Sequence, residues 1–349
     1  MIQKSWKIGG LALLAYVISM CFLVPLGPGL LEFQDAQSAG VVANLDRKVS
    51  VYRLVGLNTH WDEQPESLHV YLKHKSALIE LPVVEVADAT HADVGLVLPD
   101  TLPSKSWDVF ASHPSDGTLL LENGLFFENA IIHEEATWPT PVVSEYPPSL
   151  DFHFPFQPRI FETIRNLMLH VPMWFTMFLL MGIGFVASIR QLSSTQSTQH
   201  DLRAESSVQV GMVFGVLGLI TGSLWARFTW GAWWVDDPQL NGAMVTVLVY
   251  AGYLILRATV ENQRLKARLA AVYNLFAFVI LIILLMVLPR FTESLHPGKG
   301  GNPGFNSYDL DSSLRMVFYP AVIGWMLLGL WMYRVRLATA ALNQKLQQL

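Results

Sequence analysis

A short segment near the middle of the chain carries the residues best suited to chemistry. Between positions 225 and 240 it holds four tryptophans and two adjacent aspartates: Trp225, Trp230, Trp233, Trp234, Asp236 and Asp237. Indole rings packed beside one another form a flat, apolar surface that suits a planar aromatic macrocycle through offset stacking. Gly231 would let the backbone approach such a ligand closely. Composition alone leaves a second interpretation open, an interfacial tryptophan belt of the kind common in membrane proteins.

Two histidines flank this segment and favour the ligand interpretation. His170 stands in the sequence Leu-His-Val-Pro-Met-Trp, and His296 stands in Leu-His-Pro-Gly. Neutral imidazole is the common protein ligand for haem iron. A histidine at membrane depth is costly without a partner, which makes His170 a functional candidate, whereas His296 taken alone is an ordinary loop residue. The coincidence of both with one aromatic loop points to a haem site.

The elements that must position these residues are membrane spans. The chain of 349 residues is 52% hydrophobic and 15% charged, below the roughly 25% of charged residues in soluble domains. A bilayer core of about 30 Å requires roughly 20 apolar helical residues. Six stretches approach that length: 8–26, 167–189, 208–225, 240–256, 270–288 and 317–333. Glycines in the third stretch indicate close helix packing.

Lysine and arginine placement orients the spans, because positive charge is retained in the cytoplasm. Basic residues precede the first span, follow the last, and crowd the connections between spans two and three and between spans four and five. We therefore predict that both termini are cytoplasmic and that the connections 27–166, 226–239 and 289–316 face outward. This orientation brings both histidines and the tryptophan segment to one outer face. The first span is interpreted as an uncleaved anchor rather than a signal peptide.

Composition also excludes several functions. The net charge of −5 provides no basic surface, so nucleic acid is not an expected partner. The single cysteine, Cys21, lies within the first span, which excludes a disulfide framework and a cysteine metal site. The sequence contains no recognisable Ser-His-Asp arrangement, phosphate loop or zinc signature, so we expect a binding and transfer protein rather than an enzyme.

The predicted fold is an all-α polytopic membrane bundle of six transmembrane helices with a small, sandwich-like all-β domain inserted. Apolar and polar residues alternate over short runs, which is the strand signature, at 49–57, 67–72, 77–86, 94–98 and 118–127. The expected parts are a first anchor (1–29), a periplasmic β-rich domain (30–137), a proline-rich linker (138–165), a five-helix haem-handling domain (166–336) and a cytoplasmic tail (337–349). Four histidines of the β-rich domain match no ligand spacing and are interpreted as ordinary surface or core residues: His60, His69, His74 and His91.

The sequence Trp-Gly-Ala-Trp-Trp-Val-Asp-Asp-Pro-Gln-Leu over 230–240 resembles the tryptophan-rich signature of haem-handling proteins. It looks like the CcmC family of system I cytochrome c maturation, and the resemblance covers roughly 165–336, including both histidine motifs, plus the first span. The resemblance implies that His170 and His296 are the axial ligands of haem b, binding its iron. The residues that it implies in porphyrin contact are Trp230, Trp233, Trp234 and Asp237, with Gly231 beside them. Arg227 within the loop is a candidate partner for a haem propionate, although interfacial snorkelling explains it as simply.

Three features depart from the family pattern. Asp236 stands where the family has a third tryptophan, and Asn241 stands where it has threonine. Because Asp236 replaces a stacking surface with a charge, we expect the contact with the porphyrin edge or with a partner to differ. The third departure is the β-rich domain, which typical members lack. Its position alone suggests a docking module for another maturation component.

The resemblance also implies a location and partners. The location is the bacterial inner membrane, and the partners are haem, membrane lipid, a periplasmic haem chaperone that receives the haem, and an ABC-type cytochrome c maturation assembly. Two alternatives stay open. One is a CcsA-type cytochrome c haem lyase or synthase, whose relatives share the tryptophan signature. The other is a haem transporter.

Overall fold

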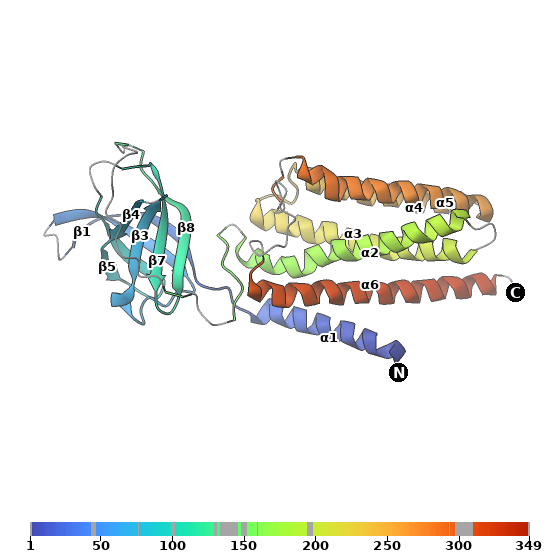
Figure 1. Cartoon of the computed structure of the whole chain (residues 1–349), viewed down its shortest axis with the longest axis horizontal. Helices are drawn as coiled ribbons and strands as arrows, with labels where there is room; N and C mark the ends of the chain where they lie inside the picture. The colour runs from blue at the N-terminus through green and yellow to red at the C-terminus, as the bar shows by residue number, and fades with distance from the viewer. Residues whose placement is uncertain are drawn as a thin grey trace. The chain divides into compact units, whose positions relative to one another are not determined.

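The chain folds into two compact units, which a computed structural model describes over most of their length (Figure 1). One unit comprises Met1–Val24 and Glu162–Leu349 and is helical, whereas the other, Pro25–Phe161, is built of strands. The described residues are 2–42, 47–75, 77–98, 102–128, 131–132, 146–147, 152–158, 160–193, 198–292, 294–296 and 310–347. Much of the proline-rich linker predicted over 138–165 therefore lies outside the described residues, as do 293 and 297–309 in the connection 289–316.

Six helices within the described residues are long and apolar enough to cross a membrane. They are α1 (Ile2–Leu23), α2 (Leu167–Ser193), α3 (Thr198–Thr229), α4 (Pro238–Thr259), α5 (Gln263–Ile282) and α6 (Ser312–Leu346). Large apolar side chains such as Ile220, Ile255 and Phe276 are more than half exposed on them. Such a surface suits lipid, so the chain is a multi-pass membrane protein.

Helix ends follow local sequence signals. Asn262 and Asp311 act as N-caps of α5 and α6, because their side chains accept hydrogen bonds from the backbone N–H groups of Leu265 and Leu314 at 3.0 and 2.7 Å. Helix α6 continues to Leu346, so most of the tail predicted over 337–349 is helical. That stretch is rich in alanine and contains neither glycine nor proline, which favours continuation of the helix.

Glycines bring α3 close to α2, as the sequence predicts. A Cβ atom added at Gly211 would lie 2.9 Å from Cε of Met181, and one added at Gly215 would lie 2.8 Å from Sδ of Met177. A larger residue at either position would displace a methionine from the interface. Close approach through small residues is the usual way in which helices pack in lipid, and the prediction for the third span is confirmed.

A buried arginine joins α3 and α4 at the helix ends that lie away from the tryptophan segment. Arg257, near the end of α4, donates to both carboxylate oxygens of Asp201 at 2.6 and 2.9 Å. It also donates to Glu205 at 2.8 Å. A bidentate arginine–carboxylate pair fixes geometry as well as charge, so this cluster sets the register of the two helices at the end of the bundle away from the tryptophan segment.

Two four-stranded antiparallel sheets form the second unit, in the strand orders β1-β2-β6-β5 and β4-β3-β7-β8. The strands are β1 (Gly29–Val42), β2 (Arg47–Leu57), β3 (His69–His74), β4 (Ala77–Leu81), β5 (Val83–Val86), β6 (His91–Leu96), β7 (Ser106–His113) and β8 (Gly117–Phe126). Side chains from both sheets meet in one core, in which Leu54, Trp61, Leu72 and Trp107 are buried. The prediction of a helical membrane bundle with an inserted sandwich-like β domain is confirmed.

The strands differ from the sequence prediction in two places. The sequence predicts one strand over 77–86, whereas β4 and β5 belong to different sheets and meet at Pro82. Proline cannot donate a ladder hydrogen bond, so the chain crosses between the sheets there. The first run that the sequence predicts as a strand begins at 49, whereas β1 begins at Gly29. Register shifts between Leu30 and Glu32 and between Asp35 and Ser38 interrupt the alternation that would have revealed β1.

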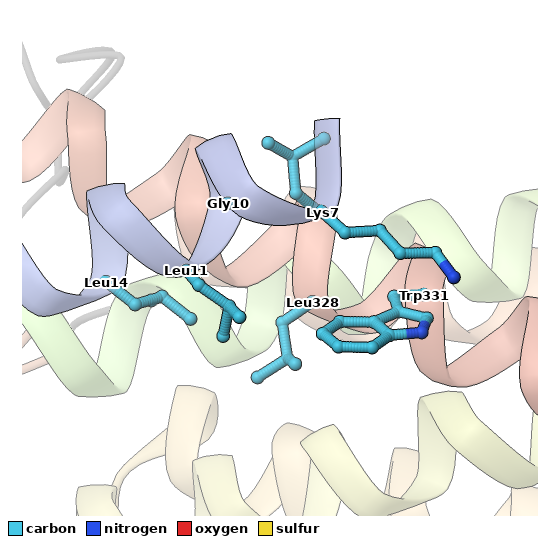
Figure 2. A pocket seen from close by; sticks show the side chains of 7 residues that line it. Lys7, Gly10, Leu11, Leu14, Leu328 and Trp331 are labelled. Carbon is cyan, nitrogen blue, oxygen red and sulfur yellow. The ribbon is translucent and has the colours of Figure 1, made fainter. Parts of the chain in front are cut away.

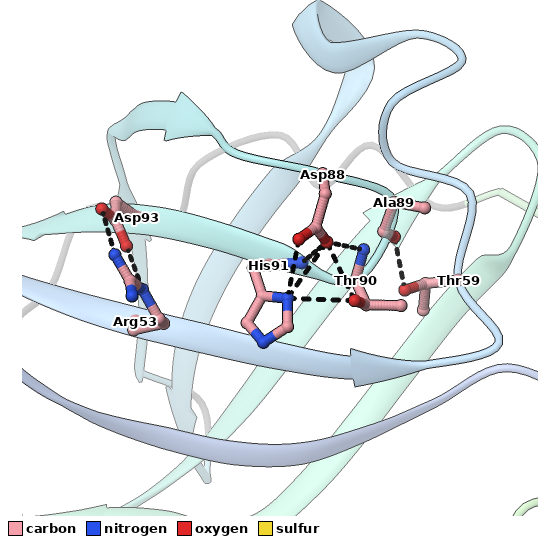
Figure 3. A network of polar contacts seen from close by, with 7 residues as sticks. All are labelled: Arg53, Thr59, Asp88, Ala89, Thr90, His91 and Asp93. Carbon is pink, nitrogen blue, oxygen red and sulfur yellow. Dashed lines mark hydrogen bonds and ion pairs between the residues drawn. The ribbon is translucent and has the colours of Figure 1, made fainter.

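Histidines of the β unit pair with nearby carboxylates. The pairs are His60–Asp116 at 2.8 Å, His69–Glu80 at 3.0 Å and His91–Asp88 at 3.0 Å. Figure 3 shows the turn before β6, where Asp88 accepts hydrogen bonds from the backbone N–H groups of Thr90 and His91 at 2.7 and 2.9 Å. The Thr90 backbone bond and the His91 side-chain bond hold the pKa of Asp88 well below its usual range. These contacts stabilise a tight turn.

The sandwich core can be tested by truncation. Leu72→Ala should destabilise the β unit by about 2–5 kcal/mol, because a fully buried side chain would leave a cavity. Leu120→Ala is the matched control, since that leucine is 40% exposed and its loss should cost no more than about 0.5 kcal/mol. Hydrogen exchange of the β3 and β7 amides at increasing urea measures both. An equal loss of stability in the two variants would contradict this assignment of the core.

Candidate functional site

The tryptophan segment is the connection between α3 and α4. Helix α3 ends at Thr229, and α4 begins at Pro238, which suits the first position of a helix. Gly231 has a φ of +81°, a left-handed conformation that glycine adopts without strain. The chain can therefore turn away from the helix axis directly after Trp230.

Helix α3 also holds this loop through side chains of its last turns. Arg227, the predicted propionate partner, donates a hydrogen bond from its guanidinium to the carbonyl oxygen of Gly231. Ser223 donates to the carbonyl oxygen of Trp233 at 2.8 Å. The ring of Trp233 itself is 59% exposed, so it is the indole of the loop that is most available to a ligand or a partner.

Asp237 is the buried acid that joins this loop to the second histidine. Its Oδ1 caps α4 by accepting from the backbone N–H groups of Gln239 and Leu240 at 2.9 and 3.2 Å. Oδ2 accepts from the backbone N–H of Leu295 at 2.7 Å, and Oδ1 lies 3.2 Å from Nδ1 of His296. Burial raises the pKa of this carboxyl, but the hydrogen bonds from His296 and Leu295 outweigh burial and hold the pKa below its usual range.

His170 lies in the first turn of α2 and contacts α3. Its Nδ1 is 3.1 Å from Oγ1 of Thr221, whose hydroxyl donates to the carbonyl oxygen of Leu217 at 2.8 Å. Since that hydroxyl proton is engaged, the threonine oxygen accepts and Nδ1 donates. A Cβ atom at Gly222 would lie 2.7 Å from Cε1 of the imidazole. Glycine at this position therefore leaves the space that the ring occupies.

Among the described residues, both imidazoles meet polar side chains through Nδ1, so Nε2 can face another ligand. The Asp237 carboxylate can only accept a hydrogen bond, so the proton of His296 is on Nδ1, as it is in His170. In this tautomer Nε2 carries the lone pair. Support of one ring nitrogen by a carboxylate or another acceptor is the usual setting of a metal-binding histidine. The site can therefore offer two nitrogen ligands to a metal.

Tryptophan rings contact both histidines edge-on. His170 meets Trp225 and Trp174 with ring centres 5.8 and 6.4 Å apart. His296 meets Trp230 at 5.3 Å. Trp225 and Trp230 both belong to the end of α3 and its continuation, so the two histidine clusters lie at the same end of this helix. The structure thus brings His170, His296, Trp230 and Asp237 together.

The two residues that depart from the family pattern are bonded to each other. Asn241 donates from Nδ2 to Oδ1 of Asp236 at 2.8 Å. Its Oδ1 accepts a hydrogen bond from Nε1 of Trp234 at 3.1 Å. The amide therefore anchors the added carboxylate to the first turn of α4 and fixes the Trp234 ring at the same time. The two replacements act as a matched pair.

Sequence reasoning missed three residues of the site. Trp174 follows His170 by four positions in α2, a spacing that places both on one helix face, so a signal for it was present. Thr221 and Gly222 carry no such signal. They reach the imidazole only because α3 packs against α2 along its glycines.

Comparison with known proteins identifies relatives of the helical unit. Residues 152–349 match the family model CcmC, described as Heme exporter protein C. The chain is 28% identical over 188 residues to heme exporter protein C of Bradyrhizobium diazoefficiens, covering 54% of this chain and 70% of that protein. It is 29% identical over 191 residues to the protein of the same name from Paracoccus denitrificans, covering 54% and 77%.

A shorter similarity reaches a second group of proteins. Over 96 residues the chain is 34% identical to cytochrome c biogenesis protein CcsA of Prochlorococcus marinus, which covers 28% of this chain and 30% of that protein. The strand-built unit Pro25–Phe161 lies almost wholly outside the family match. Because that match covers more than half of the residues and includes the histidines and the tryptophan loop, the chain belongs to the CcmC family.

Proposed function

We propose that this protein binds haem b at the outer face of the bacterial inner membrane and passes it to a periplasmic haem chaperone during cytochrome c maturation. The observation that carries the proposal is the pair of histidines beside the tryptophan loop, each of which meets a polar side chain of the described residues through Nδ1 and can present Nε2 to a ligand. Relatives named for heme export and for cytochrome c biogenesis support haem as the cargo.

The residues present suit this cargo. His170 and His296 would supply axial imidazoles, and the Asp237 carboxylate would increase the basicity of the second one. Trp230 and the exposed Trp233 would contact the porphyrin face. Trp234 and Gly231 would complete this wall of the site. Arg227 keeps guanidinium N–H groups beyond the one that meets Gly231, so it can also pair with a propionate.

Transfer of haem would require that one axial histidine dissociates before the other. His170 is fixed in a transmembrane helix, whereas His296 follows the short 3-10 turn Leu288–Arg290 and is held by Asp237. We assign the yielding role to His296. A chaperone that offers its own ligand would replace this imidazole while His170 still holds the iron.

The proposed orientation places both termini and the ABC-type assembly in or beside the cytoplasm. Basic residues gather at the helix ends that include Arg264 and Lys345, and the positive-inside rule assigns this end to the cytoplasm. The expected domain 30–137 would then be periplasmic and available to dock another maturation component. No catalytic residue is assigned, because binding and exchange of ligands account for this function.

A CcsA-type haem lyase is the second candidate, favoured by the 34% identity over 96 residues. The two functions differ in their product. Purified protein that attaches haem covalently to an apocytochrome without a chaperone would support the lyase. Haem that passes to the chaperone and goes no further would support haem delivery.

Visible absorption spectra test the haem site directly. The detergent-purified protein, from cells supplied with haem, should show a Soret band with low-spin features. His170→Ala and His296→Ala should each lose those features, because each removes one of two axial nitrogens. His91→Ala, in the β unit, is the control and should leave the spectrum unchanged. A wild type without haem, or two unaltered variants, would overturn the proposal.

Asp237→Asn tests the carboxylate behind His296. Haem affinity should fall about 10–100-fold, as is typical when the support of a metal ligand is lost. Because the pKa of Asp237 is lowered in the folded protein, its ionised form stabilises the fold. The stability advantage of the wild type over the variant should be constant above about pH 5 and be lost as the pH falls through about 3.9 and below. Thermal unfolding at each pH measures it, and an advantage that shrinks between pH 7 and pH 5 would point to a histidine instead.

Gly222→Ala tests the packing of the first histidine. The added methyl group would meet Cε1 of His170 at 2.7 Å, so the ring must shift and haem retention should fall about tenfold or more. Gly9→Ala is the matched control, because a Cβ atom there meets nothing within 4 Å. Haem content per protein after gel filtration measures both. Equal haem content in the two variants would show that His170 does not depend on this space.

A further inference from the structure

Residues of α1 and α6 line a groove that contains neither histidine of the proposed haem site (Figure 2). Helix α1 lines it with Lys7, Leu11 and Leu14, which are spaced at about one helical turn. Helix α6 lines it with Leu328 and Trp331. Leu11 is 50% exposed, so the groove opens to the outside of the bundle, where lipid lies.

The groove forms because the two helices touch through glycines. A Cβ atom at Gly10 would lie 3.0 Å from Cβ of Leu327, and one at Gly324 would lie 3.1 Å from Cδ2 of Leu14. The backbones therefore come close at these points, while the longer side chains beside them form walls. The result is a shallow, largely apolar groove along the surface of the bundle.

One end of the groove carries positive charge. Nζ of Lys7 lies 5.0 Å from the ring centre of Trp331 and 5.9 Å from that of Trp6. Cζ of Arg334 lies 5.0 Å from the Trp6 ring. Within the described ranges no acidic side chain forms an ion pair with either cation. Two cations thus gather on indole faces without a carboxylate to neutralise them.

We propose that this groove binds an anionic phospholipid, with its phosphate at Lys7 and Arg334 and an acyl chain along Leu11, Leu14 and Leu328. The order of the lining residues matches the order of polarity in a lipid, from a charged end to an apolar stretch of about 10 Å. Anionic headgroups attract basic residues at the membrane surface, and indoles prefer the same depth. A transmembrane helix of a partner would cover the leucines but leave both cations unmatched.

Native mass spectrometry of the full-length protein tests this site. The probe is phosphatidylglycerol, present as a minor component in nanodiscs of phosphatidylcholine. The wild type should retain phosphatidylglycerol several-fold above its share. The double variant Lys7→Gln/Arg334→Gln should lose that preference. The control Arg264→Gln/Lys345→Gln removes two cations from the same end of the bundle outside the groove. This control variant should keep the preference for phosphatidylglycerol.

Two results of the mass spectrometry would overturn the proposal. One is an equal loss in the control, which would reduce the effect to general surface charge. The other is a wild type without preference, which would leave the groove to a partner helix. If the double variant does not fold, tail-brominated phosphatidylglycerol should still quench wild-type fluorescence more than brominated phosphatidylcholine, and Trp331→Phe should remove the excess. Equal quenching by both lipids would also overturn the site. Neither measurement involves haem, so the outcome is independent of the proposed function.

Discussion

The buried carboxylate of Asp237 is the constraint on which the end of the bundle that carries the tryptophan loop depends. A charge removed from water is costly unless hydrogen bonds replace its hydration. Here the backbone N–H groups at the start of α4, the N–H of Leu295 and the imidazole of His296 supply those bonds. One side chain therefore caps a helix and fixes a histidine. A movement of the α4 terminus therefore bears on His296, because both bond to Oδ1 of this carboxylate.

The other histidine depends on helix packing instead. Contacts repeat along the interface of α3 and α2 at intervals of three and four residues, and each pairs a glycine with a large side chain: Gly211 with Met181, Gly215 with Met177, Gly218 with Trp174 and Gly222 with His170. His170 is the last member of this series. The periodicity that packs the helices therefore also positions the imidazole, and Thr221 adds a polar partner, which a ring at this depth requires.

Local signals were enough to predict much of this structure. Span length predicts the six helices, and the tryptophan motif singles out the loop and the aspartate that caps α4. The features that escaped depend on how side chains meet, or how the backbone is shifted, once the chain is folded. The bond of Asn241 to Asp236 and Trp234 looks, in the sequence, like two unrelated departures from a pattern. Strand β1 escaped because its bulges break the alternation on which strand prediction rests.

The two histidines are held by different means, and that difference bears on the proposed function, in which haem is first bound and then released. A ligand fixed by helix packing can move only if two membrane helices separate. A ligand fixed by one carboxylate can move when a few hydrogen bonds exchange, which costs far less. Under the proposed function, substitutions around Asp237 would therefore change how readily His296 dissociates from haem without disturbing His170. Under the proposed function, the two axial histidines would thus be fixed by different elements, His170 by the packing of α2 on α3 and His296 by Asp237.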